Sequence, residues 1–270
     1  MSLRRIRRAM ALAFALANCA LRYRLLRVRG PLSLEKRALW LQSAARGVLG
    51  SLGICVRVEG ALPGCGLVAA NHLSYLDIVV FAAVMPCFFV AKREVKRWSF
   101  FGNAARSGGT IFLDRASLAS ANAAAAEIAA RLALPVPVLL FPEGTSSDGN
   151  TVLRFHSRLF LPAVQLAAPV TAAAIRYVPA DGMDERELCW YGDAEFLDHL
   201  WRVLGHASFT AHLNFGMPRR YSDARNAAEQ TRVETIAMRI ECRPALRQHG
   251  AAMPERLRSV TRPVSTEQLF

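Results

Sequence analysis

The sequence is short of acidic residues. Its 270 residues include 21 Asp and Glu against 34 Lys and Arg, which gives a formal net charge of +13 at pH 7. This balance indicates an anionic partner, such as nucleic acid, an anionic lipid surface or an acidic carrier protein. Eight arginines and no acid fall within the first 29 residues. The positive charge is therefore most one-sided at the N-terminus.

The sequence also lacks a Pro/Ser-rich linker, an internal repeat and any long uninterrupted apolar run. A chain of 270 residues without a linker is usually one large domain or two small ones. About 18 uncharged apolar residues without a break are typical of a membrane-spanning helix. No such run occurs here, although the hydrophobic content of the whole chain is high, at 53%. We therefore expect a protein that lies on a bilayer without clearly spanning one.

Cysteine pairs with metal-ligand spacing are missing as well. None of the six cysteines belongs to a C-x2-C pair, and several lie inside apolar runs. This pattern argues against zinc and against disulfides, and predicts buried free thiols in a reducing compartment.

Apolar runs alternate with helical periodicities along the chain. This alternation predicts an α/β fold, a layered sheet flanked by helices. Ser33 is a candidate N-cap for the second helix. Expected strands are 54–58, 67–70, 87–91, 110–113, 136–141, 170–177 and 209–215; expected helices are 10–21, 34–52, 78–85, 117–134, 155–167 and 222–241. We expect a helical hairpin in residues 1–53, a main domain in 54–243 and a loosely held tail in 244–270.

Two polar turns each follow an apolar run. The first contains His72 and Asp77, five residues apart in Asn-His-Leu-Ser-Tyr-Leu-Asp. This spacing is about 140° around a helix, so we expect His72 in the turn before a helix and Asp77 in its first turns, reaching back. A neutral histidine oriented by a carboxylate is a general base. A simpler interpretation is that both residues only cap a helix and complement its dipole.

The second turn is Phe-Pro-Glu-Gly-Thr at 141–145. Turns at the carboxyl ends of parallel strands meet at one edge of a sheet. We therefore expect the two turns to form one site. Glu143 could also be an ordinary glutamate in an exposed turn.

In this order, the motifs resemble those of the glycerolipid acyltransferase superfamily, of the 1-acylglycerol-3-phosphate acyltransferase type. The family's His-x4-Asp motif matches His72 to Asp77, and its Phe-Pro-Glu-Gly-Thr motif matches residues 141–145. Between them, Gly-Thr-Ile-Phe-Leu-Asp-Arg at 109–115 matches a third motif, and an apolar strand with an internal proline at 168–175 matches a fourth. The resemblance extends over about residues 56–177.

The resemblance implies transfer of a fatty acyl group from acyl-CoA or acyl carrier protein to the hydroxyl of a lysolipid. With 1-acylglycerol-3-phosphate as acceptor, the product is phosphatidic acid. His72 would be the base and Asp77 its orienting partner, with no cofactor, no metal and no acyl-enzyme. Glu143, Gly144 and Thr145 would bind the acceptor.

Cations near the predicted site are candidates for an acceptor phosphate. A guanidinium matches phosphate oxygens well, which favours Arg115, with Lys92 adding to a positive rim. Arg115 could instead pair with Asp114 or be a surface charge. The chain also has Ser146 where the family usually has arginine, and His156 or Arg158 could substitute.

Three other functions stay open. Residues 190–201 look like bacterial family members that acylate lyso-ornithine lipids, whose acceptor has a carboxylate in place of a phosphomonoester. A thioester hydrolase would use the same base with water as acceptor. The charge also suits a nucleic-acid-binding protein, although no helix-turn-helix, zinc or RRM signature accompanies it, and we expect no nucleic acid as partner.

The N-terminus combines the apolar stretch 10–21 with flanking arginines. This composition predicts an interfacial helix on an anionic membrane surface, at the cytoplasmic face of the inner membrane. A cleaved signal peptide and a single short transmembrane anchor are the alternatives.

Overall fold

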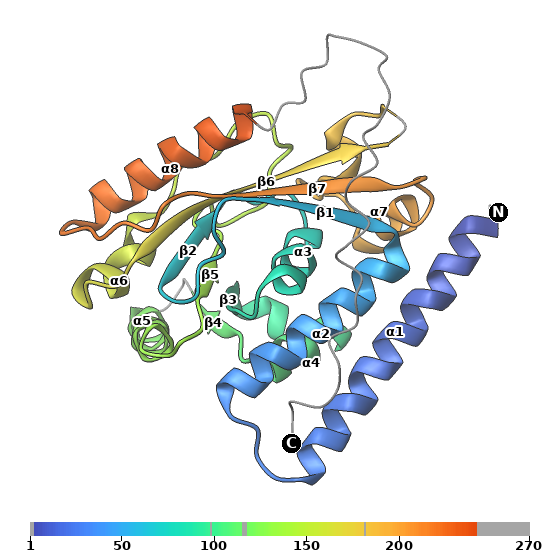
Figure 1. Ribbon diagram of the computed structural model, residues 1–270, viewed down its shortest axis with the longest axis horizontal. Helices are drawn as coiled ribbons and strands as arrows, with labels where there is room; N and C mark the ends of the chain where they lie inside the picture. Colours follow the sequence, from blue (N-terminus) through green and yellow to red (C-terminus); the bar gives the residue numbers. More distant parts are fainter. Residues whose placement is uncertain (1–2, 98, 115–117, 181, 242–270) are drawn as a thin grey trace.

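The computed structural model describes residues 3–97, 99–114, 118–180 and 182–241. A seven-stranded sheet in the order β1-β7-β6-β2-β5-β3-β4 forms its centre (Figure 1). β6 and β7 are antiparallel, and the other neighbouring strands are parallel. The strands are β1 Ile54–Glu59, β2 Leu67–Ala70, β3 Phe88–Lys92, β4 Ile111–Leu113, β5 Val138–Leu140, β6 Val170–Pro179 and β7 Phe209–Phe215. The predicted α/β class is confirmed.

β2 is a central strand, and all four of its residues are fully buried. Leu67 pairs with Val138 of β5 on one side and with Val170 of β6 on the other. β2 and β5 are therefore parallel neighbours, and their carboxyl ends lie at the same edge of the sheet. The expectation that the two polar turns meet is confirmed.

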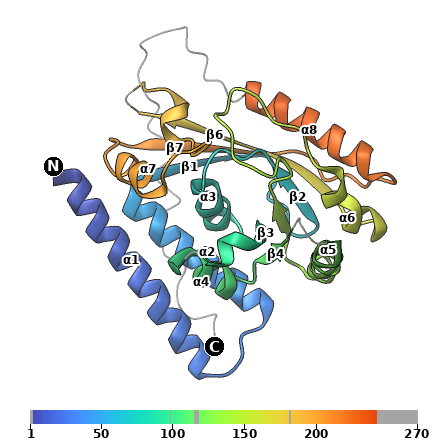
Figure 2. The same ribbon diagram turned by 180° about the vertical axis from the view of Figure 1, so that it is seen from behind.

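Helices cover both faces of the sheet, which explains why its central strands are apolar throughout. One core cluster joins the sheet to α2, α3 and α7, and the other joins it to α5, α6 and α8 (Figures 1 and 2). The α-helices are α1 Leu3–Val28, α2 Leu34–Leu52, α3 Leu76–Val84, α4 Ser99–Gly108, α5 Leu118–Leu132, α6 Leu161–Gln165, α7 Phe196–Val203 and α8 Ala224–Glu241; the 3-10 turns are η1 Arg93–Arg97, η2 Ser157–Phe160 and η3 Glu185–Leu188.

The predicted helical hairpin precedes the sheet as α1 and α2. The Ser33 hydroxyl accepts a hydrogen bond from the N–H of Lys36 at 3.4 Å, as expected of an N-cap. α1 has 26 residues, so it extends well beyond the apolar stretch 10–21 at both ends. In the described part of the chain, α1 is the one helix long and apolar enough to cross a membrane. None of the residues in its most apolar stretch is buried. Both views place it on the outer side of α2 (Figures 1 and 2).

One arginine of α1 is used inside the protein. Arg8 is 9% exposed and donates to the carbonyl oxygens of His206 at 2.5 Å and Ala207 at 2.8 Å, in the loop before β7. Ala9 and Leu12 pack on the core beside it. Arg8 is thus unavailable to a lipid headgroup, and α1 is attached to the main body near its N-terminal end.

Some local expectations were wrong. Residues 155–167 form the turn η2 and the short helix α6 in place of one helix. Pro162 explains the break, because proline is tolerated in the first turn of a helix but not further along. Cys87 and Cys189 are buried free thiols, but Cys55 and Cys65 are exposed. The predicted tail, 244–270, lies outside the described residues.

Candidate active site

The first turn of the site begins where β2 ends. The Asn71 side chain accepts from the N–H of Ile175 at 2.8 Å and donates to its carbonyl oxygen at 3.1 Å. An amide side chain thus takes over the pairing with β6 that the β2 backbone makes up to Ala70. This frees the backbone to turn, and it fixes the position of His72.

His72 and Asp77 meet as the spacing predicts. Asp77 is the second residue of α3 and is fully buried. Its Oδ2 lies 2.7 Å from Nδ1 of His72 and also accepts from the N–H groups of Leu73 at 2.7 Å and Ser74 at 3.0 Å. Asp77 therefore makes the contacts that both interpretations predict. It accepts from backbone N–H groups at a helix start, and it holds the His72 imidazole in place.

Two further aromatic residues complete this arrangement. The ring of Phe141 stacks on the His72 ring, with centroids 4.1 Å apart and planes 13° apart. The hydroxyl of Tyr177 donates to Oδ1 of Asp77 at 2.5 Å. The carboxylate and the stacked ring together fix the imidazole plane, and the His72 side chain stays 19% exposed.

Glu143 is buried in the second turn and not exposed. It is 5% exposed, and its Oε1 accepts from the N–H of His72 at 3.0 Å. Oε2 is buried without a hydrogen-bond partner among the described residues. Burial raises the pKa of Glu143 to about 7, against the opposing effect of the hydrogen bond from His72. Gly144 follows with φ 76°, which glycine adopts without strain, and Thr145 is exposed.

Three of the four candidate phosphate-binding residues, Lys92, His156 and Arg158, lie in the described part of the chain, and all three are exposed. Lys92 is exposed at the carboxyl end of β3, the parallel neighbour of β5. Asp114 pairs with Arg93 at 2.8 Å. Arg115 lies outside the described residues, so its role stays a prediction. His156 and Arg158 are exposed, and the N–H of His156 donates to the Pro142 carbonyl oxygen at 2.9 Å.

Ser146, where the family usually has arginine, has a structural contact. Its hydroxyl donates to the Trp190 carbonyl oxygen at 2.5 Å, and the N–H of Trp190 donates to the Leu73 carbonyl oxygen at 2.8 Å. The loop before α7 is thereby joined to both turns of the site. Within the described residues, no cluster of three His, Cys, Asp or Glu side chains is arranged to hold a metal.

Sequence reasoning missed three contributors to this site. Asn71 carried a usable signal, because a polar residue directly follows a fully apolar strand. Phe141 belongs to the second motif, but the motif alone does not indicate that its ring stacks on His72. Tyr177 had no local signal, since it is 100 residues from its partner Asp77.

Comparisons with known proteins agree with the motifs and the fold. A family model described as Acyltransferase matches residues 54–176. A 1-acyl-sn-glycerol-3-phosphate acyltransferase of Neisseria meningitidis serogroup B is 33% identical over 184 residues, which cover 67% of this chain and 72% of that protein. A lyso-ornithine lipid O-acyltransferase of Rhizobium meliloti is 36% identical over 197 residues, 67% of each chain.

A solved structure shows the same fold. The crystal structure of the acyltransferase PlsC from Thermotoga maritima matches with a TM-score of 0.63 at 20% identity, covering 88% of this chain and 97% of that one. At this identity the likeness concerns the fold, while the relatives above establish kinship. On the combined strength of the motifs, the matched region and these relatives, the chain belongs to the acyltransferase family.

Proposed function

We propose that this acyltransferase moves a fatty acyl group from an acyl thioester to the free hydroxyl of a lysolipid, with 1-acylglycerol-3-phosphate as acceptor and phosphatidic acid as product. The observation that carries the proposal is the 2.7 Å contact between Nδ1 of His72 and Oδ2 of Asp77. A carboxylate on one ring nitrogen sets the tautomer and makes the other nitrogen a base.

The proposed reaction is a direct transfer. Nε2 of His72 takes the proton of the acceptor hydroxyl while the hydroxyl oxygen attacks the carbonyl carbon of the thioester. The tetrahedral intermediate then expels the thiolate, which takes the proton back from His72. An ester and a free thiol leave, either coenzyme A or acyl carrier protein, and no covalent enzyme intermediate forms.

Glu143, Gly144 and Thr145 are assigned to acceptor binding. Oε2 of Glu143 is a buried oxygen that has no partner among the described residues, and a substrate hydroxyl would satisfy it. We assign Arg115 and Lys92 to the acceptor phosphate.

We also propose that residues 1–53 hold the enzyme on the cytoplasmic face of the cell membrane, with 54–243 as the acyltransferase domain. Exposed apolar side chains of α1 support this: Met10 is 62%, Phe14 74% and Leu25 59% exposed. Arginines at both ends of the helix add attraction to anionic lipid.

A lyso-ornithine lipid is the second candidate acceptor. Ser146 replaces the family's usual arginine, and its hydroxyl donates a hydrogen bond to the Trp190 carbonyl oxygen. This leaves one cation fewer near the turn to receive a phosphate. The Rhizobium meliloti relative carries that activity in its name.

One assay separates these functions. Purified full-length enzyme is given radiolabelled acyl-CoA or acyl carrier protein with either lysolipid, and the products are separated. Label in phosphatidic acid supports the first proposal, and label in ornithine lipid supports the second. Label only in free fatty acid indicates a hydrolase and contradicts both. Lipid analysis of a strain lacking the gene then identifies the acceptor in the cell.

A further inference from the structure

β6 places a buried tyrosine against the proposed catalytic pair. Tyr177 is 1% exposed, and its hydroxyl donates to Oδ1 of Asp77 at 2.5 Å. Burial and the Asp77 carboxylate both raise the pKa of Tyr177, so its hydroxyl stays protonated as a donor. Because the other oxygen of Asp77 faces His72, this bond fixes the rotation of the carboxylate.

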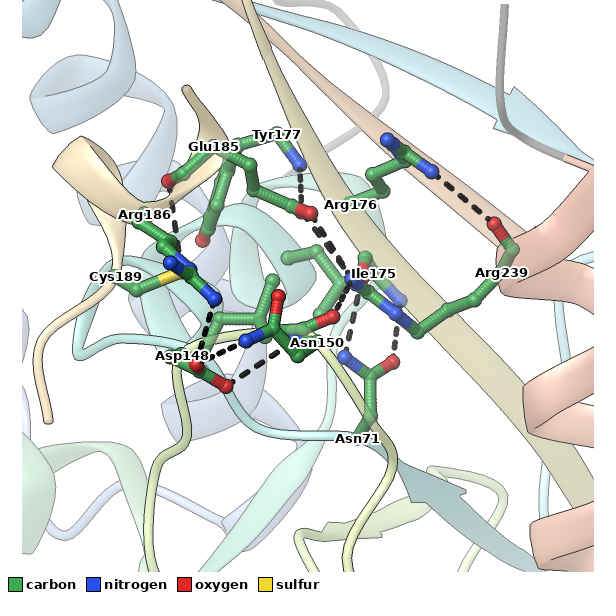
Figure 3. Close-up of polar contacts among 12 residues, drawn as sticks. Asn71, Asp148, Asn150, Ile175, Arg176, Tyr177, Glu185, Arg186, Cys189 and Arg239 are labelled. Carbon is green, nitrogen blue, oxygen red and sulfur yellow. Dashed lines mark hydrogen bonds and ion pairs between the residues drawn. The ribbon is translucent and has the colours of Figure 1, made fainter.

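The backbone of β6 beside Tyr177 is held by an arginine of α8 (Figure 3). Arg239 is 8% exposed and donates to the carbonyl oxygens of Ile175 at 2.5 Å and Gly149 at 2.7 Å. It also pairs with Glu185 at 3.0 Å. Oε1 of Glu185 accepts the N–H of Tyr177 at 2.8 Å.

The same stretch of β6 meets the turn that carries the base. The carbonyl oxygen of Ile175 receives both Arg239 and the side chain of Asn71, and Asn71 directly precedes His72 (Figure 3). A shift of residues 175–177 would therefore displace Asp77 through Tyr177, and His72 through Asn71.

We propose that Arg239 is a positioning residue for acyl transfer, acting through β6 and Tyr177 on Asp77. The proposal rests on the assignment of His72 and Asp77 as the catalytic pair. Removing the guanidinium takes the donor away from Oε2 of Glu185 and from the Gly149 carbonyl oxygen, and it leaves the Ile175 carbonyl oxygen with Asn71 alone, so the segment has to rearrange. Arg239 and Tyr177 both lie after residues 54–176, the region that the family model matches. The proposed positioning contacts therefore come from residues outside the matched region.

The test uses two conservative variants of the full-length enzyme. Tyr177→Phe removes one hydroxyl, and Arg239→Lys keeps the charge but loses the planar fork that reaches three acceptors. We expect each to lower kcat about tenfold while KM for both substrates stays within about twofold, because small misplacements of a base act on the chemical step. In the double variant we expect no further loss beyond the larger single effect, since both act along one path.

A matched control separates positioning from general loosening of α8. Ala227→Gly weakens the same helix at a buried position twelve residues before Arg239, in a core cluster that contains neither Ile175 nor Tyr177. We expect a lower Tm with unchanged kcat. Should Arg239→Lys fail to fold, Glu185→Gln tests the same contact.

Three results would overturn the proposal: kcat of Tyr177→Phe within twofold of wild type, fully additive effects in the double variant, or Ala227→Gly lowering kcat as much as Arg239→Lys does. His72→Ala distinguishes this failure from failure of the proposed function. If His72→Ala is inactive and Tyr177→Phe is normal, only the positioning role is wrong; if His72→Ala is active, the proposed chemistry itself is wrong.

Discussion

The backbone N–H of His72 donates to Oε1 of Glu143 at 3.0 Å. This hydrogen bond joins the two motif turns directly, across the neighbouring strands β2 and β5. The proposed base, His72, and the residue proposed to bind the acceptor, Glu143, are therefore held in a fixed relative position. A displacement of either turn would displace the other.

The first prediction concerns the base. His72→Ala should abolish measurable transfer and Asp77→Asn should impair it severely, because a positioned base contributes roughly 10²–10⁴ in rate. Initial rates with labelled acyl donor measure this, with circular dichroism as the check on folding. Activity of His72→Ala within a few-fold of wild type would exclude the mechanism.

The second prediction concerns the buried carboxyl of Glu143. Its pKa is raised from 4.5 to about 7 in the folded protein, so the folded state holds an extra proton between these values. Stability should fall as pH rises through this window. Glu143→Gln lacks this titration, so its free energy of unfolding relative to wild type should increase from pH 5 to pH 8, by up to about 3 kcal/mol. Urea unfolding at four pH values measures the difference, and a difference independent of pH would refute the assignment.

The third prediction concerns the acceptor. Glu143→Ala and Arg115→Ala should raise KM for the lysolipid more than KM for the acyl donor, because we assign both to acceptor binding. Separate titrations of the two substrates check this. If Arg115→Ala leaves the kinetics of a phosphate acceptor unchanged, lyso-ornithine lipid becomes the better acceptor assignment.

The fourth prediction concerns the membrane. Met10→Asp with Phe14→Asp should move the protein from the membrane fraction to the soluble fraction, because both side chains are exposed apolar groups of α1. Deletion of residues 1–29 should do the same. The double substitution is the cleaner test, since the deletion also removes the buried Arg8.

Val233→Asp is the control for this prediction, because Val233 is 50% exposed on α8, away from the hairpin. It should leave fractionation unchanged. Raising the salt concentration should weaken the attraction of the arginines to anionic vesicles but leave the apolar contribution. Full membrane retention of the double variant would mean that the attachment lies elsewhere, for example in α2 or on the main body.

The sequence allowed the sheet and the contact between His72 and Asp77 to be predicted for different reasons. β2 and β5 are buried on both faces, so they appear as short apolar runs wherever they occur in a chain. His72 and Asp77 are close in sequence, so turn and helix geometry alone brings them together. Both predictions depended on local information.

What the sequence did not reveal depends on tertiary contacts. α7 was missed because its short run, Phe196–Val203, carries too few turns for a helical period to stand out. Tyr177 reaches Asp77 only because β6 lies beside β2, and Arg239 reaches β6 only because α8 packs on it. Contacts between segments that are far apart in the chain produce no characteristic spacing of residues, so the sequence alone does not predict them.

The contact of Arg8 with the loop before β7 has a geometric consequence for the whole molecule. α1 has no freedom to swing on a tether, because it is fastened to the body near its N-terminal end and joined to α2 by a short connection at the other. A bilayer that holds α1 would therefore also set the tilt of the sheet and the height of His72 above the lipid. Such an enzyme would sample its substrate by lateral diffusion in the leaflet, at a fixed depth, and its turnover would follow the surface density of the lysolipid and not its bulk concentration.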